Sequence, residues 1–195
     1  MGWREKLETM ERFQLDLDLE TKKYLKGQID KITEELRRMS HEEPWAEQML
    51  YLMQIPGFGV VTGMTVLAAI GDIARFESPK KLASYSGLVP GVEQSGVKKR
   101  GKGITKEGRR ELRWAMVEVA RRAVKADPHW KHLFTNLERR MPRNRAFVVI
   151  ARHLLTLVWY VLLRQEPYAH YSSERIAYKY YTWSWQLNKA QGIAQ

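Results

Sequence analysis

The chain has 195 residues, 44% of them hydrophobic and 28% charged, which suits one ordinary globular domain or a small domain with an appended helix. It contains no cysteine, so disulfides, cysteine zinc sites and cysteine nucleophiles are excluded. With 33 Lys and Arg against 22 Asp and Glu, the net charge of +11 favours an acidic partner, and nucleic acid is the usual one.

The first predicted element is a long helix from about Arg4 to Met39, where no proline occurs. Five of its apolar residues step by 4, 3, 4 and 3 positions, as in the seam of a coiled coil: Leu25, Ile29, Ile32, Leu36 and Met39. An upstream set steps by sevens but lies one position out of register: Met10, Leu17 and Tyr24. We expect residues 1–43 to form a coiled-coil-like arm for oligomerisation or docking. An ordinary amphipathic helix of the same fold is the alternative.

A compact helical domain is predicted over residues 44–168, and it begins with two helices joined by a glycine turn. The helices run over about Trp45–Gln54 and Val61–Ile70, and Pro56-Gly57-Phe58-Gly59 separates them. Residues 50–70 thus have the form of a helix-hairpin-helix, in which glycines let backbone N–H groups approach a phosphate. We predict that Gly57 and Gly59 contact nucleic acid, with Ile55, Phe58 and Val66 filling the interhelical core. A tight turn between packed helices is the alternative.

Three more helices complete a mainly α fold. A short one opens at Ser78-Pro79, because serine is a good cap and proline suits the first helical position. A second runs from about Arg110 to Lys125 and ends at Asp127-Pro128. The third covers about Asn144–Leu163.

The long apolar stretch Phe147–Leu163 is 17 residues long, at the lower limit for a membrane span. It contains Arg152, His153 and Thr156, so we predict a buried core helix and no membrane contact. The aromatic tail 169–195 is expected to dock either on the core or on a partner.

A glycine-rich basic loop over residues 87–108 is the most informative segment. Ser95 precedes a glycine, and many cationic residues follow it: Lys98, Lys99, Arg100, Lys102, Lys106, Arg109, Arg110 and Arg113. Residues 96–125 hold 11 basic and 3 acidic side chains, as expected of a nucleic-acid surface. Attack of a serine on a phosphodiester develops negative charge that lysine, arginine or a metal must stabilise. Ser95 is therefore a candidate nucleophile among candidate phosphate ligands, although a plain turn serine is the alternative.

A second basic turn surrounds Pro142, with Arg143 and Arg145 as candidate phosphate or RNA contacts. A solvated loop is the alternative. His129 and His132 have the spacing to share a metal, but no third ligand is evident, so no metal site is predicted in this chain.

Seven segments between about residues 50 and 165 follow one another in a recognisable order: Ile55–Gly59, Ile70–Phe76, Ser78–Leu82, Tyr85–Pro90, Gln94–Gly96, Gly103–Gly108 and Leu112–Arg113. In order and spacing they resemble the C-terminal transposase domain of the insertion-sequence-one-hundred-ten family. That family comprises bacterial DEDD-type transposases, described as bridge-RNA-guided recombinases. The preceding long helix resembles the coiled-coil linker of the family.

The resemblance implies a function for each part of the chain. Ser95 matches the serine that attacks a DNA strand and becomes covalently joined to it. A RuvC-like half implies a divalent metal such as Mg²⁺ beside that serine, and a structured guide (bridge) RNA pairs with the DNA. No such half is recognised in this sequence, so we expect a truncated or split recombinase that is catalytically incomplete alone.

The expected partners are DNA, the guide RNA, a RuvC-like half or full-length relative, and a second copy bound through the N-terminal helix. The expected location is the bacterial cytoplasm, at the nucleoid when the protein is bound to DNA. Two alternatives stay open: a non-catalytic helix-hairpin-helix module that binds DNA or RNA, and an oligomerisation fragment.

Overall fold

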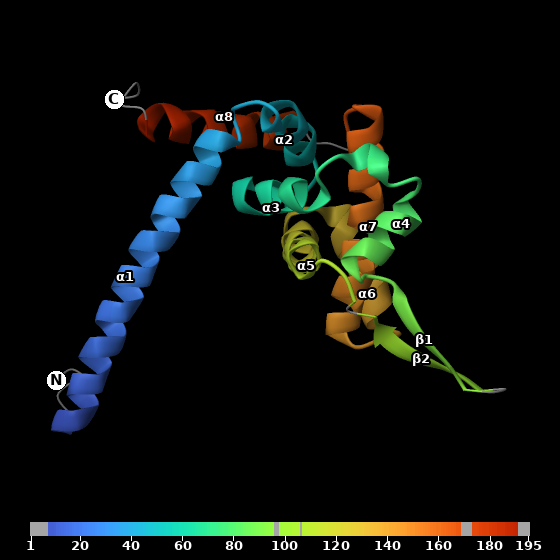
Figure 1. Ribbon diagram of the computed structural model, residues 1–195, viewed down its shortest axis with the longest axis horizontal. Coiled ribbons are helices and arrows are strands. Elements are labelled where there is room, and N and C mark those ends of the chain that lie inside the picture. Colours follow the sequence, from blue (N-terminus) through green and yellow to red (C-terminus); the bar gives the residue numbers. More distant parts are fainter. Residues whose placement is uncertain (1–7, 96–97, 106, 169–172, 191–195) are drawn as a thin grey trace.

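The computed structural model describes residues 8–95, 98–105, 107–168 and 173–190, with side chains at all of these positions except 90–103, 173, 175 and 186–190. Figure 1 shows a helical body from which α1 and a β-hairpin project in different directions. The mainly α fold predicted from the sequence is confirmed, and a two-stranded antiparallel sheet is added to it. In chain order the elements are α1 (Thr9–Met39), α2 (Trp45–Gln54), α3 (Val60–Ile70), η2 (Ile73–Arg75), α4 (Pro79–Ser86), β1 (Pro90–Ser95), β2 (Lys98–Ile104), α5 (Arg110–Ala126), α6 (Pro128–Glu138), α7 (Arg143–Arg164) and α8 (Ser173–Ala190).

The core lies between α7 and the helices α2, α4, α5 and α6, and α3 packs on α5. Ten residues of α7 are buried, and they span more than half of the circumference of the helix. By length and composition α7 could cross a membrane, but 56% of its apolar window is buried inside the protein. The predicted core helix is therefore confirmed. The predicted interhelical core is confirmed as well, because Ile55, Phe58 and Val66 are all buried.

Two helix starts show how local sequence positions the body. The Ser78 hydroxyl accepts a hydrogen bond from the Lys81 N–H, and Pro79 is the first residue of α4, as predicted. At the start of α6, the Asp127 carboxylate accepts hydrogen bonds from the N–H groups of His129 and Trp130 at 2.9 and 3.3 Å. An aspartate cap followed by proline begins a helix here. From the sequence, the same pair predicted only the end of the preceding helix.

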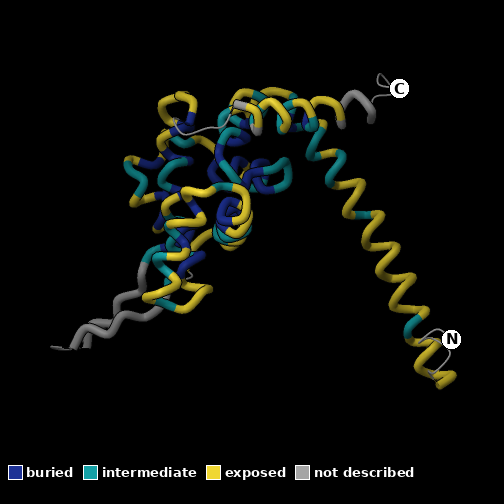
Figure 2. Tube along the Cα trace, turned by 180° about the vertical axis from the view of Figure 1, so that it is seen from behind, coloured by how far each residue is buried: buried dark blue, intermediate teal, exposed yellow. Residues whose placement is uncertain are grey.

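Helix α1 extends away from the body and buries none of its residues, as Figure 2 shows. Its described part begins at Thr9, where the Glu11 carboxylate accepts a hydrogen bond from the Glu8 N–H. The predicted start near Arg4 lies outside the described residues. Its exposed large apolar side chains include members of both predicted stripes, Met10, Leu17, Tyr24, Leu25, Ile29 and Ile32, and also Phe13 and Leu19, which lie in neither stripe.

Helix α8 docks the aromatic tail on the corner between α1 and α2. The Trp183 indole N–H donates a hydrogen bond to the Ser40 hydroxyl at 2.8 Å, and its ring stacks on His41. The Lys179 ammonium donates to the Met53 and Ile55 carbonyls at the end of α2, where a helix leaves carbonyls without partners. Burial lowers the pKa of Lys179 to about 8. The tail was expected to dock either on the core or on a partner, and the structure shows α8 docked on the core.

Candidate functional site

The serine loop forms a hairpin that projects from the body (Figure 1). Strands β1 and β2 pair antiparallel, and Ser95, the last residue of β1, lies opposite Lys98. The next two register pairs join Gln94 to Lys99 and Glu93 to Arg100. The backbone of the predicted nucleophile therefore runs beside the basic strand. The side chains of Ser95, Lys98, Lys99, Arg100 and Lys102 lie outside the described part, as does Lys106 altogether.

Close backbone packing fixes the base of this hairpin. Gly108 has φ +119°, and a Cβ at this position would lie 2.2 Å from the Tyr85 carbonyl oxygen. The Arg109 N–H donates to that same carbonyl at 2.8 Å, and the Thr105 N–H donates to the Val89 carbonyl at 3.0 Å. A side chain at position 108 would be strained and would clash. The segment that enters α5 therefore packs tightly against the C-terminal end of α4, and the hairpin projects from this contact.

Arg113 supports this base from α5. Its guanidinium donates a hydrogen bond to the Ser86 carbonyl at 3.0 Å, at the C-terminal end of α4. Arg113 is only half-buried, yet one of its N–H groups is committed to the protein itself. The predicted contact between Arg113 and nucleic acid stays a prediction, and the structure adds a role in bracing the hairpin.

The two glycines of the helix-hairpin-helix have different surroundings. Gly57 is buried with φ +91°, and a Cβ there would lie 2.2 Å from the Val119 carbonyl oxygen of α5. This glycine is therefore needed for close packing between the turn and α5. The Gly59 N–H donates to the Thr62 hydroxyl at 3.0 Å, which completes the start of α3. A Cβ at Gly59 would lie 3.7 Å from a guanidinium nitrogen of Arg122, so a cation lies beside the N-terminus of α3. Phosphate binding by either glycine stays a prediction.

The other predicted phosphate ligands are exposed and lie at two helix starts. Arg109 and Arg110 mark the beginning of α5, and Arg143 and Arg145 the beginning of α7. The Arg143 guanidinium stacks over Phe134 at 5.3 Å and Phe147 at 5.7 Å, and it pairs with Glu138. Stacking of this kind restricts the guanidinium before any ligand arrives.

Sequence reasoning missed two cations of this surface, Arg121 and Arg122 on α5. The Arg121 guanidinium stacks over Phe147 at 5.8 Å, so α5 and α7 contribute arginines to the same aromatic ring. The available signal was helical periodicity, since Arg121 lies on the side of the helix opposite the apolar positions. Within the described residues there is no group of three or more histidine or carboxylate side chains that could hold a metal ion.

Residues 49–135, which run from α2 into α6 and include the hairpin, match the family described as transposase IS116/IS110/IS902. Residues 49–135 thus carry the domain of this transposase family. A transposase for insertion sequence element IS1111A from Coxiella burnetii is 37% identical over 121 residues, which cover 60% of this chain and 33% of that protein. A pilin gene-inverting protein of Moraxella bovis is 32% identical over 120 residues, 60% of this chain and 37% of its own length.

A third relative extends the match within the chain. The insertion element IS900 uncharacterized 42 kDa protein of Mycobacterium paratuberculosis is 32% identical over 150 residues, 74% of this chain and 35% of that protein. The chain thus spans about a third of the length of these three relatives.

Proposed function

We propose that this chain is a DNA-cleaving and rejoining module of a transposase and that Ser95 is its nucleophile. The observation that carries this proposal is the register of the hairpin, where Ser95 ends β1 opposite Lys98 of the basic strand β2. A projecting hairpin can reach a DNA backbone that the helical body cannot enclose. The similarity to transposases and to a gene-inverting protein supports the same chemistry.

In the proposed step, the Ser95 hydroxyl oxygen attacks the phosphorus of a DNA phosphodiester. A bond forms between serine oxygen and phosphorus, the bond from phosphorus to one deoxyribose oxygen breaks, and that oxygen takes up a proton as the serine loses one. The reverse attack by a hydroxyl of another strand then releases the serine and joins the strands. Cations of β2 and of the start of α5 stabilise the charge that develops on the non-bridging oxygens.

The described residues contain no group of three or more histidine or carboxylate side chains that could hold a metal ion. We assign a divalent metal such as Mg²⁺ to a RuvC-like partner half. A structured guide RNA would share the basic surface of α5 and α7 with the DNA. The proposed setting is the bacterial cytoplasm.

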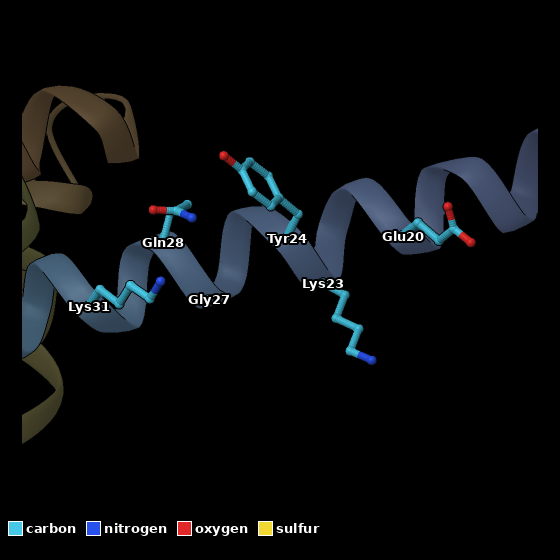
Figure 3. A pocket seen from close by; sticks show the side chains of 6 residues that line it. All are labelled: Glu20, Lys23, Tyr24, Gly27, Gln28 and Lys31. Carbon is cyan, nitrogen blue, oxygen red and sulfur yellow. The ribbon is translucent and has the colours of Figure 1, made fainter.

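The exposed arm α1 supports a partnership with a second copy. Most of its apolar residues, from Met10 to Ile32, are exposed, and apolar surface of this kind marks a protein interface. Figure 3 shows Tyr24 and Gln28 pointing to the same side of the helix, next to the bare backbone of Gly27. A Cβ at Gly27 would meet nothing within 4 Å, so a neighbouring helix has room to approach closely there.

The nucleophile is tested by forming a covalent protein–DNA product. The chain is mixed with a RuvC-like half, Mg²⁺, guide RNA and labelled target DNA, and the mixture is separated under denaturing conditions. Labelled protein is expected for the native chain and none for Ser95→Ala. Ser84→Ala, an exposed serine of α4, is the matched control and should retain the product. An undiminished product with Ser95→Ala would refute the assignment.

A second function, binding without chemistry, is favoured by one observation. The exposed arginines of α5 and α7 form a cationic surface that does not depend on the hairpin serine. This function predicts that the logarithm of the duplex affinity falls by about 0.9 per phosphate contact for each tenfold rise in salt. It also predicts no covalent product under any condition.

A further inference from the structure

Among the described residues from α2 to α7, the most exposed large aromatic side chain is a tryptophan of α5. Trp114 on α5 is 50% exposed, whereas Trp130, Trp159 and Trp183 are 6%, 9% and 5% exposed. A tryptophan left this open on an otherwise packed domain indicates a surface that binds something. No hydrogen bond or ring contact of Trp114 is found within the described chain, and its helix is among the best packed of the body.

Arginines lie on the same side of α5 as this ring. Arg110 precedes Trp114 by four residues and Arg121 follows it by seven, spacings that place all three along one line of a helix. We call these three residues the α5 stripe. Glu118 flanks the stripe and pairs with Arg121 at 3.0 Å, while Arg121 also stacks over Phe147. Arg143 reaches the same ring from α7, which widens the cationic surface beyond the stripe.

We propose that Trp114 is a stacking platform for an unpaired nucleotide base and that the arginines around it contact the neighbouring phosphates. Every base has an aromatic face, so stacking on tryptophan is strong and tolerant of sequence. Bases within a duplex are stacked on one another, so the ligand is single-stranded. The cations favour a polyanion over the apolar surface of another protein.

The stripe is also well placed for the proposed function, on which this inference rests. Helix α5 begins directly after the hairpin returns to the body, at the contact between the Arg109 N–H and the Tyr85 carbonyl. A strand bound along the hairpin would therefore continue towards Trp114. The unpaired base belongs either to an opened DNA strand or to a loop of the guide RNA, and both have the same stacking chemistry.

The test measures the affinity of the full chain for three ligands by fluorescence anisotropy: a 15-nucleotide DNA strand, the corresponding RNA strand and a 15-base-pair DNA duplex. Trp114→Ala should weaken binding of at least one single strand about fivefold or more, because stacking of one base contributes about 1–3 kcal/mol. Trp114→Phe should retain most of the affinity. Duplex affinity and the slope with salt should not change, because no phosphate contact is lost.

Trp185→Ala is the matched control, since Trp185 is 42% exposed but lies on α8, away from the α5 stripe. It should leave all three affinities unchanged. The source of the base is the nucleic acid, DNA or RNA, whose single strand loses more affinity for the Trp114→Ala variant. Because Trp114 is exposed, Trp114→Ala should melt at the native temperature.

Three results would overturn the proposal: unchanged single-strand binding by Trp114→Ala, an equal loss for single strands and duplex, or a loss of self-association in sedimentation with binding intact. The last result would mean that the ring contacts a protein. The nucleophile is judged separately, because Ser95→Ala removes the covalent product without affecting the Trp114 difference.

Discussion

Helices α1 and α7 are both long, with 31 and 22 residues, but they have opposite relations to the rest of the protein. Helix α7 buries ten residues, and α5, α4, α6 and α2 surround it. Helix α1 buries none, and most of its apolar side chains face solvent, although Leu36 and Met39 near its C-terminal end pack partly against the body. A helix in a protein is stabilised mainly by packing of its apolar face. The chain therefore supplies the partners of α7, whereas it leaves most of the apolar side chains of α1 exposed.

Truncating one leucine on each helix should give the largest difference. Leu154 of α7 is fully buried, so Leu154→Ala should lower the free energy of unfolding by about 3 kcal/mol, through lost burial and the cavity left behind. Leu25→Ala on α1 removes the same atoms from an exposed site and should cost less than about 0.5 kcal/mol at low protein concentration. Urea unfolding measures both, and equal losses would contradict the comparison.

The junction between arm and body should respond to pH. The folded pKa of Lys179 is about 8, below its ordinary value of 10.5, so the unfolded state binds more protons between these values and stability rises with pH. Between pH 8 and about pH 9.5 the native chain should gain about 2 kcal/mol relative to Lys179→Met. Burial also raises the pKa of the neighbouring Tyr180. The series of unfolding measurements therefore ends at a pH below the range in which tyrosine loses its proton. Parallel pH curves for the two chains would rule out the buried ammonium.

A charge on the arm should affect assembly and leave the monomer intact. Ile29 is 62% exposed, so Ile29→Glu should not change the monomer's unfolding, but in an apolar interface it should weaken self-association at least tenfold. Sedimentation equilibrium gives the dissociation constant. Lys22→Glu changes a residue outside the two apolar stripes and lowers the charge by two, against one for Ile29→Glu, so it is a stringent control for added negative charge. An unchanged mass distribution for Ile29→Glu would show that α1 does not pair through this face.

Much of the helical body could be predicted because its signals are local. The predicted helix starts at Trp45, Ser78-Pro79 and Arg110 agree with α2, α4 and α5, since caps, proline and apolar spacing act within a few residues. Helix α6 was missed although Asp127-Pro128 carries the same kind of start signal as Ser78-Pro79. Helix α8 was not placed because its docking depends on Lys179 and Trp183 reaching residues more than a hundred positions away.

Less of the candidate site than of the fold could be predicted from the sequence. The hairpin was predicted only as a glycine-rich basic loop, because β2 is rich in lysine and glycine and shows no alternation of apolar residues. Unaided, the residues around Ser95 left a plain turn serine as an alternative, and only the family resemblance favoured the nucleophile. The packing roles of Gly57 and Arg113 depend on α5 and α4 approaching each other and the turn, which no local pattern encodes.

The attachment site of the DNA tests the central claim most directly. After the strand-transfer reaction, nuclease trimming and trypsin digestion, the peptide of residues 82–98 contains three serines, Ser84, Ser86 and Ser95, together with Tyr85. Fragmentation mass spectrometry should place the residual nucleotide on Ser95 alone. A nucleotide on Ser84, Ser86 or Tyr85, or an unmodified peptide beside a genuine covalent product, would contradict the account.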